Sequence, residues 1–151
     1  LELDSSIVIR SEPMYGFDNV SKQLTFGTNT FENDVKIGYS ELLRKPIFID
    51  DIPNIISSLI DKNQSGIFNL AGPTKLRWID FLIELSELVN ARNKIKIVDN
   101  SGWILEPPFD SSLSTSKIAS LGIQTTDFKD ANKKIKQLFI NFNQKKEKKI
   151  C

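Results

Sequence analysis

Apolar and polar residues follow two different periods along this chain. Four short stretches are rich in β-branched residues or alternate apolar with polar positions, as strands do. These stretches are residues 5–11 (SSIVIRS), 46–49, 66–72 (GIFNLAG) and 94–98 (KIKIV). Apolar residues recur at helical spacing over residues 51–60, 77–90 and 128–142. Strands that alternate with helices predict an α/β fold.

The clearest helix signal begins at Asp51. The apolar positions that follow form one stripe: Ile52, Ile55, Ile56, Leu59 and Ile60. This spacing is typical of a helix with one face packed on a core. We expect Asp51 to cap the helix, and Pro53 lies in its first turn, where a missing N–H costs little.

The remaining segments give weaker signals. The second and third long helices carry apolar stripes, so Trp78 and the phenylalanines are core residues by default. We expect Pro13 and Gly16 to break the chain after the first strand, with Tyr15 and Gly16 in a turn. Residues 35–43 read as a weak strand, whereas residues 19–33 follow no clear pattern.

Composition narrows the class of protein. The chain has 151 residues, no histidine and one cysteine, Cys151, so we expect no metal site and no disulfide, as in a cytoplasmic protein. We expect residues 1–143 to form the folded part and residues 144–151 a basic, frayed tail. Because the basic run is terminal, we expect no nucleic-acid partner, and no apolar run is long enough to span a membrane.

The motifs of a self-sufficient enzyme are missing. No two of the seven glycines are three residues apart, so the chain has no Gly-rich dinucleotide fingerprint. Neither Tyr15 nor Tyr39 is followed four places on by lysine, so a Tyr-x-x-x-Lys proton-transfer pair is absent. We therefore assign no catalytic residue. The chain begins at Leu1 without methionine, and we expect it to be a piece of a longer protein.

Four stretches, taken in order, carry a family resemblance. They are IVIRSEPMYG (7–16), RKPIFIDDI (44–52), SGIFNLAG (65–72) and EPPFDSSLSTSKIASLGI (106–123). In this order they resemble the C-terminal half of extended short-chain dehydrogenase/reductases that act on nucleotide sugars, and most closely the dTDP-4-dehydrorhamnose reductases. The resemblance implies the C-terminal portion of a doubly wound Rossmann-type sheet plus a small mixed α/β lid that binds the substrate. NAD or NADP would then be bound mainly by the absent N-terminal half.

The resemblance also implies site residues. In epimerase-like members an arginine seven places before the helix-opening aspartate grips the substrate diphosphate, and Arg44 stands seven before Asp51. A guanidinium suits phosphate because it gives paired, charge-assisted hydrogen bonds. The other implied substrate-binding residues are Arg10, Asn69 and Trp103, and the loop with Ser11, Pro13 and Met14 would contact the cofactor.

Each residue also has a purely structural interpretation. Arg44 could be a surface strand residue near Asp50, and Arg10 could pair with a nearby carboxylate. Asn69 could satisfy local backbone, and Trp103 could belong to a minor core.

Two positions depart from the family pattern, and they keep other functions open. Rhamnose-type reductases usually carry tryptophan where Pro13 stands, and an arginine is expected where Pro107 stands. A non-catalytic module like the regulatory β subunit of methionine adenosyltransferase is therefore an alternative, as is an unrelated α/β domain. We expect a nucleotide-sugar substrate as the partner. A homodimer is also compatible with the sequence.

Overall fold

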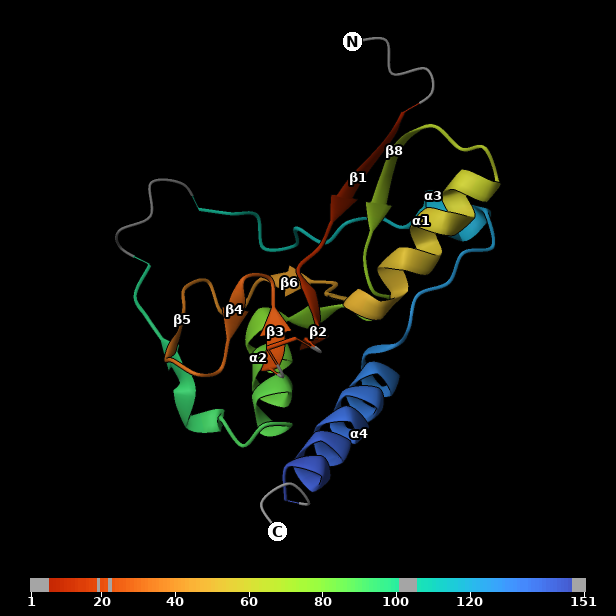
Figure 1. Ribbon diagram of the computed structural model, residues 1–151. Helices are drawn as coiled ribbons and strands as arrows, with labels where there is room; N and C mark the ends of the chain where they lie inside the picture. Colours follow the sequence, from red (N-terminus) through yellow and green to blue (C-terminus); the bar gives the residue numbers. More distant parts are fainter. Residues whose placement is uncertain (1–5, 19, 22, 101–105, 148–151) are drawn as a thin grey trace.

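The computed structural model describes residues 6–18, 20–21, 23–100 and 106–147. These residues form two regions, each with its own hydrophobic core (Figure 1). We call the first the sheet region; its elements are β1 (Ile7–Ser11), β8 (Gly66–Leu70), α1 (Ile52–Asp61) and α3 (Ser116–Ser120). The second, the lid region, contains the other strands, α2 (Trp78–Glu87) and α4 (Phe128–Glu147).

The sheet region is built on a parallel pair of strands. β1 and β8 pair in register from Ile7 opposite Gly66 to Ser11 opposite Leu70. Because side chains alternate across a strand, Phe68 and Leu70 face the inner side, where they are fully buried with residues of α1 and α3. The β-branched run predicted as the first strand is confirmed.

The first long helix differs from its prediction in two ways. Ile55 and Leu59 are buried as expected, but Ile60 is 58% exposed because it lies at the edge of the stripe, away from the sheet. Asp51 makes no side-chain cap. Its carboxylate instead accepts hydrogen bonds from the backbone N–H (2.7 Å) and the hydroxyl (2.6 Å) of Thr126, so it ties the start of α1 to the segment before α4.

The lid region contains a four-stranded sheet in the order β4-β3-β2-β7. Its strands are β2 (Met14–Asp18), β3 (Gln23–Phe26), β4 (Asn29–Thr30) and β7 (Ile47–Phe48). The predicted break after the first strand is confirmed at Pro13, since β1 ends at Ser11 and β2 begins at Met14, but the predicted turn at Tyr15 and Gly16 is wrong. Gly16 lies within β2, where a Cβ atom would collide with the side chain of Ile49. The close approach of Ile49, rather than a turn, explains this glycine.

Two further strand pairs complete the lid region. The parallel pair joins β5 (Val35–Ile37) to β10 (Ile95–Ile97), and the antiparallel pair joins β6 (Leu43–Arg44) to β9 (Leu76–Arg77). The predicted strand over residues 35–43 is therefore two strands, separated at Tyr39, which has a positive φ of 47°. Short 3₁₀ helices span Ile49–Asp51 and Arg92–Lys94.

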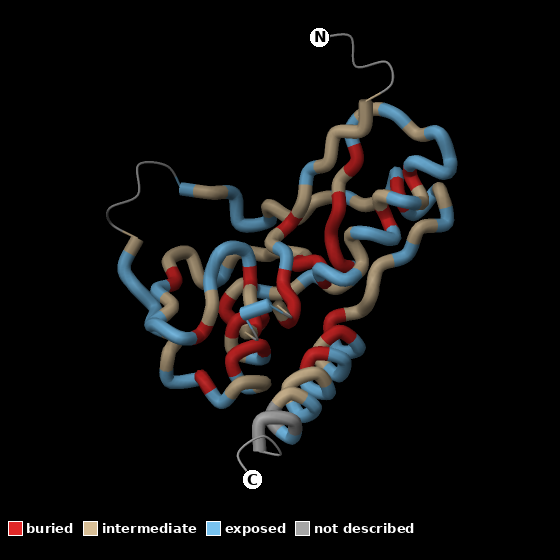
Figure 2. The backbone as a smooth tube through the Cα atoms, in the orientation of Figure 1, coloured by how far each residue is buried: buried red, intermediate tan, exposed pale blue. Residues whose placement is uncertain are grey.

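An aromatic cluster forms the centre of the lid core. The ring of Tyr15 lies 5.8 Å from that of Phe48, 5.2 Å from that of Phe81 and 5.6 Å from that of Phe128. Burial, followed by the nearby charges of Asp51 and Asp127, raises the pKa of Tyr15 above its ordinary value. Figure 2 shows the buried positions gathered between α2, α4 and the lid strands, while the outer face of α4 is exposed.

The last helix extends to Glu147, beyond the predicted end at Phe142. Its lysines up to residue 136 lie on the exposed face: Lys129, Lys133, Lys134 and Lys136. In the described part of the chain, no helix combines the length and apolar character needed to cross a membrane.

Candidate functional site

A cavity of about 670 Å³ opens where β1 ends and the lid begins. We call it the strand-end cavity. Its walls combine residues of the β1–β2 connection, the β3–β4 turn, the start of the first 3₁₀ helix and the start of α2: Ser11, Glu12, Pro13, Met14, Thr25, Phe26, Gly27, Thr28, Asn29, Ile49 and Trp78. The volume lies in the range of small-molecule sites. In open α/β sheets, such sites lie beyond the carboxyl ends of the strands, as this one does.

The three residues that the resemblance implied for cofactor contact line this cavity. They are Ser11, Pro13 and Met14. Their backbone is held on two sides, because the N–H of Ile47 donates to the Pro13 carbonyl (3.0 Å) and the N–H of Gly27 donates to the Met14 carbonyl (2.6 Å). The wall is therefore fixed by both neighbouring strands, β7 and β3.

Glu12 is a residue of this wall that the sequence analysis missed. It is only 3% exposed. Its Oε1 accepts a hydrogen bond from the backbone N–H of Leu113 (2.7 Å), whereas its Oε2 has no partner among the described residues. A buried carboxylate is costly unless it is hydrogen-bonded. Glu12 thus ties the segment before α3 to the end of β1. The sequence signal for this residue was an acidic side chain directly before Pro13, at the end of a predicted strand.

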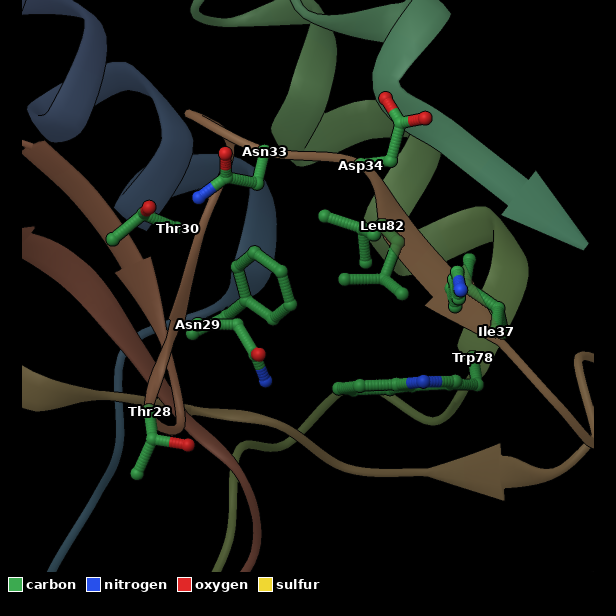
Figure 3. A pocket seen from close by; sticks show the side chains of 11 residues that line it. Thr28, Asn29, Thr30, Asn33, Asp34, Ile37, Trp78 and Leu82 are labelled. Carbon is green, nitrogen blue, oxygen red and sulfur yellow. The ribbon is translucent and has the colours of Figure 1, made fainter.

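A second cavity of about 450 Å³ adjoins the first; we call it the hairpin cavity. Phe26, Thr28, Asn29 and Trp78 belong to the walls of both. Figure 3 shows that polar side chains from β4 and the loop that follows it lie around this cavity, among them Asn29, Asn33 and Asp34, with the Trp78 indole at one end. Trp78, predicted as a core residue, packs against the lid core but is only half-buried.

Arg10 and Asn69 lie opposite each other at the carboxyl ends of β1 and β8. Arg10 is exposed, and the amide of Asn69 donates to the backbone carbonyl of Ser114 (3.1 Å). Neither residue is part of the wall of the two cavities above. They share the outer face of the parallel pair with Val8 and Ile67.

Arg44 lies in β6, half-buried and opposite Leu76 of β9. In the part of the chain that the structure describes, no ion pair includes Arg44 or Arg10. The predicted role of Arg44 toward a diphosphate stays a prediction, because this residue is not on the walls of either cavity. Trp103 lies outside the described residues.

Comparisons with known proteins identify the fold. No known family profile matches the sequence, and no curated protein matches it. Among solved structures, a dTDP-4-dehydrorhamnose reductase from Bacillus anthracis in complex with NADP is similar, with a TM-score of 0.63 and 14% identity. The match covers 85% of this chain and 47% of that one.

Two further structures show the same likeness. A dTDP-4-dehydrorhamnose reductase from Yersinia enterocolitica has a TM-score of 0.62 and 18% identity, over 88% of this chain and 49% of that one. A UDP-glucuronic acid 4-epimerase from Bacillus cereus, in complex with UDP-glucuronic acid and NAD, has a TM-score of 0.63 and 15% identity, over 90% and 45%. The chain thus spans about half the length of these enzymes. The predicted fold class is confirmed: the chain carries a portion of a Rossmann-type sheet together with a small mixed α/β lid.

Proposed function

We propose that this chain is the substrate-binding half of an NAD(P)-dependent sugar-nucleotide reductase or epimerase, of the dTDP-4-dehydrorhamnose reductase type. The observation that carries the proposal is the strand-end cavity, which lies at the carboxyl end of a Rossmann-type strand in the fold of such enzymes. Ser11, Pro13 and Met14 on its wall would border the nicotinamide of NAD or NADP.

The parallel strand pair supports a missing second half. Parallel sheets occur almost only with both faces covered, yet Ile67 on the outer face is 44% exposed. In the described part of the chain, β1 pairs with β8 alone, so its other edge is open. A dinucleotide-binding half would supply a neighbouring strand for this edge and a cover for the outer face. It would also supply the Gly-rich loop and the Tyr-x-x-x-Lys pair.

The chemistry would be divided between the two halves. Hydride would pass between the nicotinamide carbon and the sugar carbonyl carbon, and the tyrosine of the other half would exchange a proton with the carbonyl oxygen. The residues of this chain would hold the sugar nucleotide in place: Arg44 at the diphosphate, with Arg10, Asn69 and Trp103 as further contacts. Correct placement of the two reacting carbons is itself a large part of such catalysis.

Binding of a nucleotide sugar tests the proposal. Calorimetric titration of the 151-residue chain with UDP-glucose and dTDP-glucose should give saturable binding. Arg44→Ala should weaken it about tenfold or more, since a charged hydrogen bond contributes about 1.5–3 kcal/mol. Arg77→Ala is the matched control, because Arg77 is an exposed arginine already paired with Glu41 and Asp80. Equal affinity in the Arg44→Ala and Arg77→Ala variants would reject the role of Arg44, and no binding to the unmodified chain would reject the function.

One observation favours a second candidate, a non-catalytic binding module. Pro13, which stands where rhamnose-type reductases usually carry a substrate-contacting tryptophan, lies on the cavity wall. A proline there removes that aromatic contact. A complementing half with the Gly-rich loop but without Tyr-x-x-x-Lys would support the module, whereas one with both motifs would support the enzyme.

A further inference from the structure

Trp78 occupies an unusual position between the two cavities. One face of its indole stacks on the fully buried ring of Phe81, with 5.0 Å between centroids and an angle of 21°. The side chain is nevertheless only half-buried, because the indole is part of both cavity walls. Part of the aromatic surface therefore remains available to a ligand that enters either cavity.

The backbone around Trp78 holds the indole in place. The N–H of Trp78 donates to the Leu42 carbonyl (2.8 Å), and the N–H of Ile79 donates to the Ser40 carbonyl (2.9 Å). These bonds anchor the first turn of α2 to the segment before β6. With Phe81 behind it, the ring is fixed before any ligand arrives, so binding costs little ordering entropy.

The polar groups beside the indole suit a flat, hydrogen-bonding ring. Figure 3 shows the indole edge-on, with the amide of Asn29 near it and that of Asn33 farther along the cavity. An amide both donates and accepts hydrogen bonds, as the edge of a nucleobase does. Aromatic side chains stack on bases because every base has a π-face.

We infer that Trp78 is the platform on which the nucleobase of the ligand stacks, with the base in the hairpin cavity and the sugar in the strand-end cavity. This inference rests on the proposed function and adds to it the residue that would recognise the base. The arrangement places the non-reacting end of the ligand away from Ser11, Pro13 and Met14, beside which the proposed hydride transfer takes place.

Tryptophan fluorescence gives a direct test. The chain has two tryptophans, so Trp103→Phe leaves Trp78 as the only reporter and Trp78→Phe leaves only Trp103. UDP, UDP-glucose and glucose 1-phosphate are titrated into both variants and into the unmodified chain. Stacking predicts that UDP and UDP-glucose quench the Trp103→Phe protein, and that glucose 1-phosphate, which has no base, does not. Because Trp103 is itself proposed as a ligand contact, the quenching of the unmodified chain by UDP should fall in Trp78→Phe by the part that Trp103→Phe retains, although calorimetry shows that UDP still binds.

A second variant measures the contribution of the ring. Trp78→Ala should weaken UDP binding about tenfold, whereas Trp78→Phe should keep most of the affinity. If Trp78→Ala does not fold, as judged by circular dichroism, the fluorescence titration of Trp103→Phe still decides. Quenching by glucose 1-phosphate but not by UDP would overturn the inference in favour of sugar stacking. If UDP-glucose binds and the Trp78 fluorescence does not change, the stacking role of Trp78 is wrong while the proposed function stands. If none of the probes binds, both the stacking role and the proposed function are wrong.

Discussion

The lid region and the sheet region bury their apolar residues in different ways. In the lid region, Phe81, Leu85 and Ile135 are fully buried between two long helices and the strands, so the core has elements on both sides. In the sheet region, Phe68 and Leu70 are as deeply buried, but only on the inner face of the strand pair. Ile67 on the outer face remains 44% exposed.

This difference shows which part of the chain can fold by itself. A core covered on both sides gains most of its hydrophobic stabilisation without a partner, whereas a parallel pair with one bare face and an open edge does not. We therefore expect the lid region to be the more stable unit and the sheet region to open at lower free energy. Because most residues of both cavity walls belong to the lid region, the cavities are held chiefly by the lid side.

The largest effect on stability is expected from removing one buried aromatic ring from each core. Phe81→Ala and Phe68→Ala each remove a fully buried ring, and each should cost about 3–5 kcal/mol. Phe81 contacts Tyr15, Trp78 and Phe128, so its loss should unfold the whole chain. Phe68→Ala should release the sheet region while the lid core stays packed. Chemical denaturation followed by near-ultraviolet circular dichroism measures both.

The outcome separates two independent regions from one cooperative unit. Retained near-ultraviolet signal in Phe68→Ala together with its loss in Phe81→Ala is the expected result. If both variants lose this signal in a single transition, the two regions fold as one body and the lid region is not the more stable unit.

Gly72 connects the two regions, and its substitution should have the next largest effect. Its N–H donates to the Lys45 carbonyl (3.0 Å), and a Cβ atom here would collide with the backbone carbonyl of Pro46. Gly72→Ala must therefore separate the end of β8 from the segment before β7, at about 2–3 kcal/mol. Gly27→Ala is the control, because no atom crowds that position and only its positive φ of 56° resists alanine, at about 1 kcal/mol. Equal thermal midpoints for the two variants would contradict the close approach at Gly72.

The local elements of the fold could be predicted from the sequence, whereas the contacts between regions could not. β1, β8 and the three long helices follow from β-branched runs and helical stripes, which are local signals. β2 was missed because Pro13 and Gly16 are typical of breaks, although Gly16 is explained by the approach of Ile49 from a distant segment. Asp51 was expected at a cap, but its partner Thr126 lies 75 residues away.

The candidate site shows the same division. The family resemblance led to Ser11, Pro13 and Met14, and the structure places all three on one cavity wall. Glu12 and Trp78 were missed because the burial of a carboxylate and the half-burial of an indole depend on how distant segments pack. Charge and ring chemistry can be read from the sequence, but exposure cannot.

Asp51 provides a smaller test of how the regions are joined. Asp51→Ala removes both hydrogen bonds to Thr126 and should cost about 1–2 kcal/mol, discounted because the carboxylate is only half-buried. Asp50→Ala is a matched control, since both aspartates lie in the same 3₁₀ turn and contribute similarly to its charge. Urea denaturation should place Asp50→Ala close to the unmodified chain. Equal losses in the two variants would show that helix-end charge, not the tie to Thr126, is what matters.

The smallest effect is expected from lowering the pH, which should weaken hydrogen bonds and an ion pair that join separate segments at the surface. Hydrogen bonds from Lys75 and then Ser112 hold the pKa of Asp110 below its usual 3.8, and a hydrogen bond from the Thr74 hydroxyl lowers that of Asp127. A carboxyl group whose folded pKa is lowered stabilises the fold while it is ionised. That contribution is present above about pH 4 and is lost as the pH falls through the folded pKa.

The thermal midpoint should therefore drop more steeply below about pH 4 in the unmodified chain than in Asp110→Asn. High salt should reduce the difference between the two proteins, because the ion pair with Lys75 is exposed. Parallel curves for the two proteins at low salt would mean that Asp110 does not contribute to holding the segment before α3 against the lid.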